Sequence, residues 1–164
     1  MRSSMLKWLW LSVLVFAIDQ LSKQIVDASM RLYETIPLLP VFQLTYLRNQ
    51  GAAFSFLSQA GGWQRWFFIA LSVGATVLIT YWLKHLDRRK TWEAAAWALV
   101  LGGAVGNLSD RVVYGYVIDF LDVFYGDWHW PAFNVADSAI TIGIGMLLID
   151  SFRGRVNAPI SSGR

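Results

Sequence analysis

Three aspartates in the second half of the chain stand at the ends of apolar stretches. Asp110 and Asp119 are nine residues apart, and Asp137 follows the run Phe133-Asn-Val-Ala at the start of another apolar stretch. Carboxylates gathered in one place repel one another unless one is protonated or pairs with a cation such as Arg111. Two carboxylates that share a proton can hydrolyse a peptide, because the ionised one activates water while the protonated one donates to the scissile carbonyl. The pattern therefore favours an aspartic protease.

Each of these residues also has a purely structural interpretation. Asp137 suits the N-cap of a helix, where the dipole favours a carboxylate, and Asp110 with Arg111 can form an ordinary charge pair at a helix end. Asp19 and Lys23 are four residues apart, so they share one helical face and can form an ion pair. We prefer a structural role for Asp19 and Lys23, because pairing offsets the cost of burying both charges.

Small residues mark two further segments. The run Gly102-Gly-Ala-Val-Gly106 has the GxxxG spacing of closely packed membrane helices. Packing explains these glycines but not Asn107, Asp110 and Arg111, which follow them. The run Asn49-Gln-Gly-Ala-Ala-Phe places small residues beside an amide, which suits a close approach of backbone to a ligand or to another helix.

Other catalytic and metal-binding patterns are missing from the sequence. There is no cysteine, which excludes disulfides, thiol catalysis and cysteine-bound zinc. The two histidines, His85 and His129, belong to neither an HExxH nor a GxSxG motif. We therefore expect no metal and no cofactor.

The composition is that of a membrane protein, since 55% of the 164 residues are hydrophobic and only 15% are charged. Four apolar stretches, at about 6–26, 66–83, 94–113 and 135–152, approach the ~20 residues that span a bilayer. The first retains Asp19, Gln20 and Lys23 where a cleavable signal peptide has small residues, so it should remain attached. The prediction is one all-α membrane domain over residues 1–164 with four transmembrane helices.

The distribution of cations predicts the orientation. Nine of the fourteen Lys and Arg residues lie before or at the start of the first stretch, between the second and third, or after the fourth. The positive-inside rule then places both termini in the cytoplasm and the segments at about 27–64 and 114–134 outside. This asymmetry accounts for the net charge of +3, so nucleic acid is not an expected partner.

The two outer segments carry different patterns. Thr35 to Leu47 is rich in β-branched and aromatic residues bounded by prolines, which predicts a small extracytoplasmic β region. The aromatic run Val117-Ile-Asp-Phe-Leu-Asp-Val-Phe-Tyr suits the bilayer interface, which would leave Asp119 near the lipid boundary. Gly61 and Gly62 offer conformational freedom for the first segment to move over a site.

Five short runs, in this order, resemble the signature of the bacterial lipoprotein signal peptidase (type II signal peptidase) family. The resemblance extends from about residue 10 to 150. The runs are Asp19-Gln-Leu-Ser-Lys23, Asn49-Gln-Gly-Ala-Ala-Phe, Gly102-Gly-Ala-Val-Gly-Asn-Leu-Ser-Asp-Arg111, Val117-Ile-Asp-Phe120 and Phe133-Asn-Val-Ala-Asp137.

The resemblance implies an aspartic endopeptidase of the bacterial inner membrane, with its site near the periplasmic face. Such an enzyme removes the signal peptide of a prolipoprotein immediately before a diacylglyceryl-modified cysteine and is the target of the cyclic peptide globomycin. Membrane lipid is a further implied partner. By the same resemblance, Asp119 and Asp137 form the catalytic dyad. The residues that would bind substrate or support the dyad are Asn49, Gly51, Asn107, Asp110, Arg111, Asn134 and Ala136.

Two other functions remain open from the residues alone. A transporter or channel could use Asp19, Lys23 and Asp110 as an ion relay. The polar residues gather at one end of the apolar stretches, however, so a continuous polar path is missing. An assembly or chaperone protein without catalytic activity could bind its clients through the aromatic outer segments.

Overall fold

A computed structural model describes residues 5–51 and 62–156 of the chain. Ala52, Ala53 and Phe54 of the second signature run, and Gly61, lie outside the described residues. The described part contains four long helices, as the apolar stretches predict. Their bounds are Leu9–Ser29 (α1, after a 3-10 turn at Met5–Trp8), Trp63–His85 (α2), Thr91–Val113 (α3) and Val135–Val156 (α4).

Helix α3 is the central helix of the bundle and packs against α1, α2 and α4. Glycines of α3 permit a close approach of α1 on one side and of α4 on the other. A Cβ on Gly102 would lie 2.7 Å from the carbonyl oxygen of Ser12 in α1, and one on Gly103 would collide with the carbonyl oxygen of Ala136 in α4. Because no larger residue fits, these glycines fix how near α1 and α4 approach α3.

Three of the helices, α1 with its preceding turn, α2 and α4, are long and apolar enough to cross a membrane. Helix α3 has the same length as α2 but carries Asn107, Asp110 and Arg111 towards its end. Its polar side chains are enclosed by the other elements, since Asn107 and Asp110 are both buried. Lipid-facing and protein-facing helices therefore differ in composition.

A four-stranded antiparallel sheet, in the order β1-β2-β3-β4, completes the fold. The predicted β region is confirmed as β1 (Thr35–Leu39) and β2 (Phe42–Asn49). The second outer segment, for which the sequence predicted no strands, forms β3 (Val117–Tyr125) and β4 (Trp128–His129). Strand β3 pairs with β2 and buries Val117, Ile118, Asp119 and Phe120. Asp119 is thus fixed on a strand, with 3% of its surface exposed.

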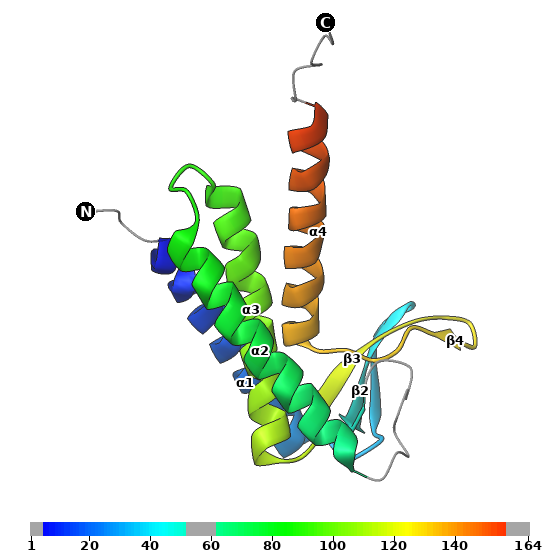
Figure 1. Cartoon of the computed structure of the whole chain (residues 1–164). Helices are drawn as coiled ribbons and strands as arrows, with labels where there is room; N and C mark the ends of the chain where they lie inside the picture. The colour runs from blue at the N-terminus through cyan, green and yellow to red at the C-terminus, as the bar shows by residue number, and fades with distance from the viewer. Residues whose placement is uncertain (1–4, 52–61, 157–164) are drawn as a thin grey trace, which may run out of the picture.

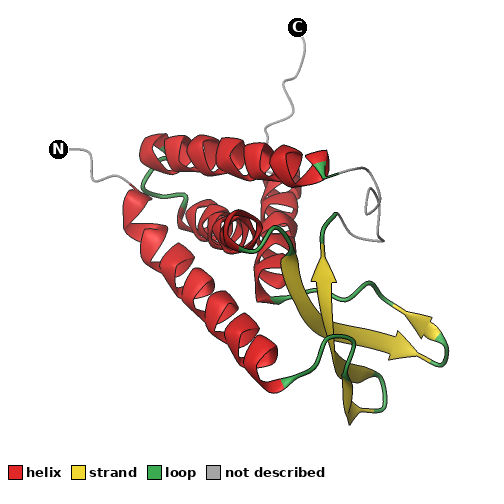
Figure 2. Ribbon diagram, turned by 90° about the horizontal axis from the view of Figure 1, so that it is seen from below, coloured by secondary structure: helices red, strands yellow, loops and turns green. Residues whose placement is uncertain are grey.

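The sheet lies at one end of the helical bundle (Figure 1). The start of α1, the connection between α2 and α3 and the end of α4 lie at the opposite end. Seen from below, the sheet extends sideways from the helix ends (Figure 2). The end of α3 and the start of α4 therefore meet the sheet at the same level.

Candidate active site

The start of α4 is a capping box. The Asn134 Oδ1 atom accepts a hydrogen bond from the backbone N–H of Asp137 at 2.9 Å, and Asp137 Oδ2 accepts one from the backbone N–H of Asn134 at 3.3 Å. Asn134 is therefore the cap, and the suggestion that Asp137 occupies that position is wrong by three residues. The N–H of Ala136 donates to Asp19 Oδ1 at 2.8 Å, so α1 satisfies a further free amide of this turn.

Asp119 projects from β3 towards this turn and receives two side-chain amides. Asn134 Nδ2 donates to its Oδ1 at 2.7 Å, and Asn49 Nδ2, from the end of β2, donates to its Oδ2 at 2.9 Å. Burial raises the pKa of Asp119, and the negative charge of Asp137 raises it further. The hydrogen bonds from Asn49 and Asn134 oppose these effects, leaving the pKa at about 7 instead of 3.8. This carboxyl can hold a proton near neutral pH.

Asp137 is held by amides as well. Asn107 Nδ2, from α3, donates to Asp137 Oδ1 at 2.8 Å. The Oδ1 atom of Asn107 accepts from Asn134 Nδ2 at 3.2 Å and from Lys23 Nζ at 3.0 Å. Within residues 5–51 and 62–156, neither Asp119 nor Asp137 forms an ion pair with Lys or Arg. We call Asp119 and Asp137 the aspartate pair.

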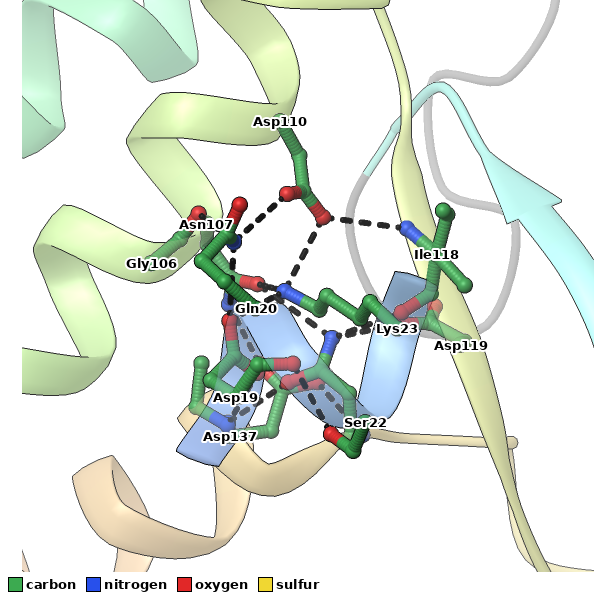
Figure 3. A network of polar contacts seen from close by, with 12 residues as sticks. Asp19, Gln20, Ser22, Lys23, Gly106, Asn107, Asp110, Ile118, Asp119 and Asp137 are labelled. Carbon is green, nitrogen blue, oxygen red and sulfur yellow. Dashed lines mark hydrogen bonds and ion pairs between the residues drawn. The ribbon is translucent and has the colours of Figure 1, made fainter. Parts of the chain in front are cut away.

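A second group of charged residues lies beside the pair. Lys23 Nζ is 2.7 Å from Asp19 Oδ2 and 2.9 Å from Asp110 Oδ2, and all three side chains are at most 2% exposed. Gln20 donates to Asp110 Oδ1 at 2.9 Å, and the backbone N–H of Ile118 donates to Asp110 Oδ2 at 3.3 Å. Figure 3 shows these contacts around the Lys23 ammonium group. We call Asp19, Lys23 and Asp110 the charge cluster.

The charge cluster corrects two expectations from the sequence. Asp110 pairs with Lys23 of α1, so the suggested helix-end pair between Asp110 and Arg111 is wrong. The Arg111 guanidinium instead donates to the carbonyl oxygens of Asn107 at 3.3 Å and Gly51 at 3.4 Å. The carboxylates consequently divide into two groups rather than meeting in one.

Gln20 is a residue of the site that the sequence argument missed, although it contacts both acids of the charge cluster. Its signal was available, since an amide beside Asp19 within an apolar helix is costly to bury without partners. The backbone N–H of Ile118 carries no such signal, because only the pairing of β3 with β2 positions it.

The aspartate pair lines a cavity of about 600 Å³. Asn49, Gly51, Asn107 and Arg111 also line it, whereas Asn134, Ala136 and the charge cluster do not. The remaining wall is largely apolar and consists of Val117, residues 130–133 before α4, and Ser138, Ile140, Thr141 and Ile142 on α4. Polar groups that converge on two carboxylates in an apolar cavity are the usual form of an active site.

Metal ligands do not gather in the part of the chain that the structure describes. No group of three or more His, Cys, Asp or Glu side chains there is arranged to hold an ion. The carboxylates of the site are instead bound by amides and by Lys23.

Comparison with known proteins identifies the family. The model of the family described as "Signal peptidase (SPase) II" matches residues 11–153, which include the aspartate pair and the charge cluster. The chain belongs to the signal peptidase II family. It is therefore a membrane protease, and its spanning helices make it an inner-membrane protein.

Relatives of the same family and a solved membrane enzyme match nearly the whole chain. The chain is 54% identical to the "Lipoprotein signal peptidase" of Alteromonas mediterranea, covering 93% of this chain and 84% of that protein. It is 56% identical to the "Lipoprotein signal peptidase" of Shewanella pealeana, covering 92% and 89%. A solved structure described as a bacterial membrane enzyme superimposes with a TM-score of 0.85 at 28% identity, covering 96% of this chain and 94% of that one.

Proposed function

We propose that this signal peptidase II is an aspartic endopeptidase that cleaves prolipoproteins immediately before the diacylglyceryl-modified cysteine. The observation that carries the proposal is the aspartate pair, in which Asp119 and Asp137 line one cavity and receive hydrogen bonds from neutral amides. Neither carboxylate forms an ion pair with Lys or Arg among the described residues, and two unpaired carboxylates in one largely apolar cavity favour sharing a proton. The names of the relatives, lipoprotein signal peptidase, support the substrate class.

Asp119 is the proton donor and Asp137 the base in this proposal. Burial and the charge of Asp137 raise the pKa of Asp119 to about 7, which supports a protonated Asp119 beside an ionised Asp137. Asp137 is less buried than Asp119 and is accessible from the cavity. Its place in the first turn of α4 also suits a base, because the helix dipole stabilises negative charge there.

The proposed reaction is one proton relay in two steps. Asp137 removes a proton from water as the water oxygen bonds to the scissile carbonyl carbon, and Asp119 donates its proton to the carbonyl oxygen. In the second step, Asp137 passes its proton to the cysteine nitrogen while Asp119 recovers one from the new hydroxyl group. The C–N bond breaks, the signal peptide leaves with a carboxyl end, and both aspartates return to their starting states.

Residues in and beside the cavity position the substrate and the pair. Asn49, Asn107 and Asn134 hold the two carboxylates through the hydrogen bonds described above. The backbone of Ala136 packs closely against Gly103 of α3, which places the start of α4 beside α3. Arg111 and Gly51 face the cavity and suit the backbone of a bound peptide. The apolar wall of residues 130–133 and α4 suits the apolar end of a signal peptide or a globomycin-type cyclic peptide.

The orientation is part of the proposal. We place both termini in the cytoplasm and the aspartate pair near the periplasmic face, within one domain of residues 1–164. The excess of cations at the end of the bundle opposite the sheet supports this orientation. A reporter that is active only in the periplasm should work when fused after Asp127 and not after Arg89; activity after Arg89 would overturn the topology.

Cleavage of a purified, lipid-modified precursor in detergent tests the function. The unchanged protein should release the signal peptide, globomycin should stop the release, and Asp137→Asn should show no turnover while it still binds precursor. A transporter or an assembly protein would leave the precursor intact with either chain. Precursor that stays uncleaved by the folded, unchanged protein would contradict the proposal.

A further inference from the structure

A second cavity, of about 330 Å³, lies where the start of α2, the end of α3 and the turn before β3 meet. None of its lining residues lines the active-site cavity. The polar groups in its wall include Gln50, Arg65, Tyr114 and Tyr116, and no carboxylate lines it. The cavity therefore has a positive charge and hydrogen-bond donors, and it is large enough for a small ligand.

Arg65 supplies that charge and is held in a fixed position. Its Nη2 atom donates to the carbonyl oxygen of Val112 at 2.9 Å, and its guanidinium lies 5.5 Å from the centre of the Trp66 ring. Gly115 has a φ of 84° and allows the backbone to pass close by, since a Cβ there would lie 3.3 Å from Arg65 Nη1. These neighbours orient the guanidinium without cancelling its charge.

The described residues provide no anion for Arg65. Its Nε atom is buried without a hydrogen-bond partner among them, and none of their carboxylates forms an ion pair with it. Arg48, whose guanidinium lies 4.8 Å from the Tyr116 ring, differs because Asp27 pairs with it at 3.3 Å. Arg65 thus remains the cation available to an anionic ligand in this cavity.

The position of the cavity indicates which kind of anion would bind to Arg65. The elements that line the cavity, the start of α2, the end of α3 and the turn before β3, lie at the end of the bundle that carries the sheet (Figure 1). Three aromatic side chains near it are exposed: Trp63 (52%), Trp66 (67%) and Tyr114 (47%). Exposed Trp and Tyr side chains are typical of the level of lipid headgroups in a membrane protein. Phosphodiester groups are the anions of that level, and a guanidinium binds phosphate oxygens through paired hydrogen bonds.

We propose that the Arg65 cavity is a binding site for the phosphodiester headgroup of a membrane phospholipid, separate from the peptide-cleaving site. The lipid tails extend along the apolar surface of α2 and α3 while the phosphate contacts Arg65. Gln50 lines this cavity, and its neighbours Asn49 and Gly51 line the active-site cavity. The segment from Asn49 to Gly51 therefore lies between the proposed headgroup site and the active-site cavity.

Binding of dihexanoylphosphatidylglycerol to the full-length protein, in a detergent without phosphate, tests the site by native mass spectrometry. Dihexanoylglycerol and inorganic phosphate are the comparison ligands, because one lacks the phosphate and the other lacks the tails. The phospholipid should bind more tightly than either. Equal binding of dihexanoylglycerol would exclude recognition of the phosphate, and equal binding of inorganic phosphate would exclude a lipid as the ligand; each outcome overturns the proposal.

Two variants locate the binding. Arg65→Gln should weaken phospholipid binding about tenfold, since it removes a charged hydrogen-bond donor. Gln50→Glu keeps the shape of an exposed side chain and should also weaken binding, because it adds a carboxylate to the cavity. Arg31→Gln is the matched control, since it removes an exposed cation outside the cavity. If Arg65→Gln proves unstable, Gln50→Glu still decides; unchanged binding in folded Gln50→Glu or Arg65→Gln protein would overturn the site.

Discussion

The charge cluster and the aspartate pair are neighbours, but their carboxylates are bound in different ways: by a cation in the first and by neutral amides in the second. In the charge cluster, the ammonium group of Lys23 lies within 2.9 Å of a carboxylate oxygen on each of Asp19 and Asp110. In the aspartate pair, the bound donors are amides, and burial together with the charge of Asp137 raises the pKa of Asp119. Asn107 joins the two groups, since it accepts from Lys23 and donates to Asp137 (Figure 3).

This difference separates carboxylates with a structural role from carboxylates with a proposed catalytic role. A carboxylate that is buried against a cation and does not line the cavity holds helices together, as Asp19 and Asp110 do through Lys23. A carboxylate that lines a cavity and forms no ion pair can gain and lose a proton, which catalysis requires. The residue type does not distinguish the two roles, because all four acids are aspartates near the same helix ends.

The largest expected effect concerns the aspartate pair. Asp119→Asn and Asp137→Asn each keep the side-chain size but remove the proton donor or the base, so each should lower precursor cleavage by about 10³-fold or more. The double variant should be little worse than either single variant, because the two residues act as one unit. Initial rates on purified protein measure this. Multiplicative losses would show that the residues act independently.

The next largest effect concerns the charge cluster. Lys23→Met leaves two buried carboxylates without their cation, which should cost about 3–5 kcal/mol of stability. A lower unfolding temperature and a lower folded yield in detergent should follow. Lys7→Met is the matched control, because Lys7 is exposed near the other end of α1. Equal stability of the two variants would remove the structural role of Lys23.

The pH dependence of cleavage sharpens the comparison. The pKa of Asp119 is raised to about 7, so its proton is present below that pH and is lost above it. Cleavage should therefore fall as pH rises through about 7, where both carboxylates become ionised. Asn49→Ala removes a hydrogen bond that lowers this pKa, so the fall should move to higher pH. A shift towards lower pH would contradict the assignment of the proton to Asp119.

The smallest effect concerns Asp122, an acid of the same strand that lies outside the cavity. Burial raises its pKa, but hydrogen bonds from Gln43, His129 and Thr45 outweigh burial and hold the pKa below 3.8. Its contribution to stability is therefore present above about pH 3.8 and is lost as pH falls through the lower value in the folded state.

Asp122→Asn should consequently lower stability at pH 7 by about 1 kcal/mol, with the difference shrinking under acid conditions, and leave cleavage within about twofold. Urea unfolding at pH 7 and at low pH measures the first effect, and initial rates measure the second. Asp127→Asn, in the exposed turn between β3 and β4, should change neither. A large loss of cleavage in Asp122→Asn would show that acidity of the strand matters beyond the pair.

Helices and the first two strands are predictable from local sequence, because apolar length and β-branched runs bounded by prolines are local properties. Strand β3 was not predictable in this way, since Val117 to Tyr125 combines aromatic and apolar residues that suit a bilayer interface equally well. Only its pairing with β2 buries Asp119 and aims it at α4.

The candidate site was likewise only partly predictable from the sequence. The sequence runs named Asn49, Gly51, Asn107, Arg111, Asp119 and Asp137, which line the cavity, but not its apolar wall on α4. They also did not show that Asp110 belongs with Lys23 rather than with Arg111. That partnership joins α1 to α3 across distant parts of the chain, so sequence spacing carries no trace of it. The division of roles in Asn134, which caps α4 and binds Asp119, is likewise a property of the folded chain.

The most direct test of the two roles compares Asp119→Asn with Asp110→Asn. Precursor cleavage and unfolding temperature are measured on the same purified preparations of each variant. Asp119→Asn should be inactive and should unfold close to the temperature of the unchanged protein. Asp110→Asn should unfold at a lower temperature, because it leaves a buried donor without its acceptor, and should retain part of the cleavage rate. Near-normal cleavage by folded Asp119→Asn, together with an inactive but equally stable Asp110→Asn, would contradict this account and make Asp110 and Asp137 the pair to test.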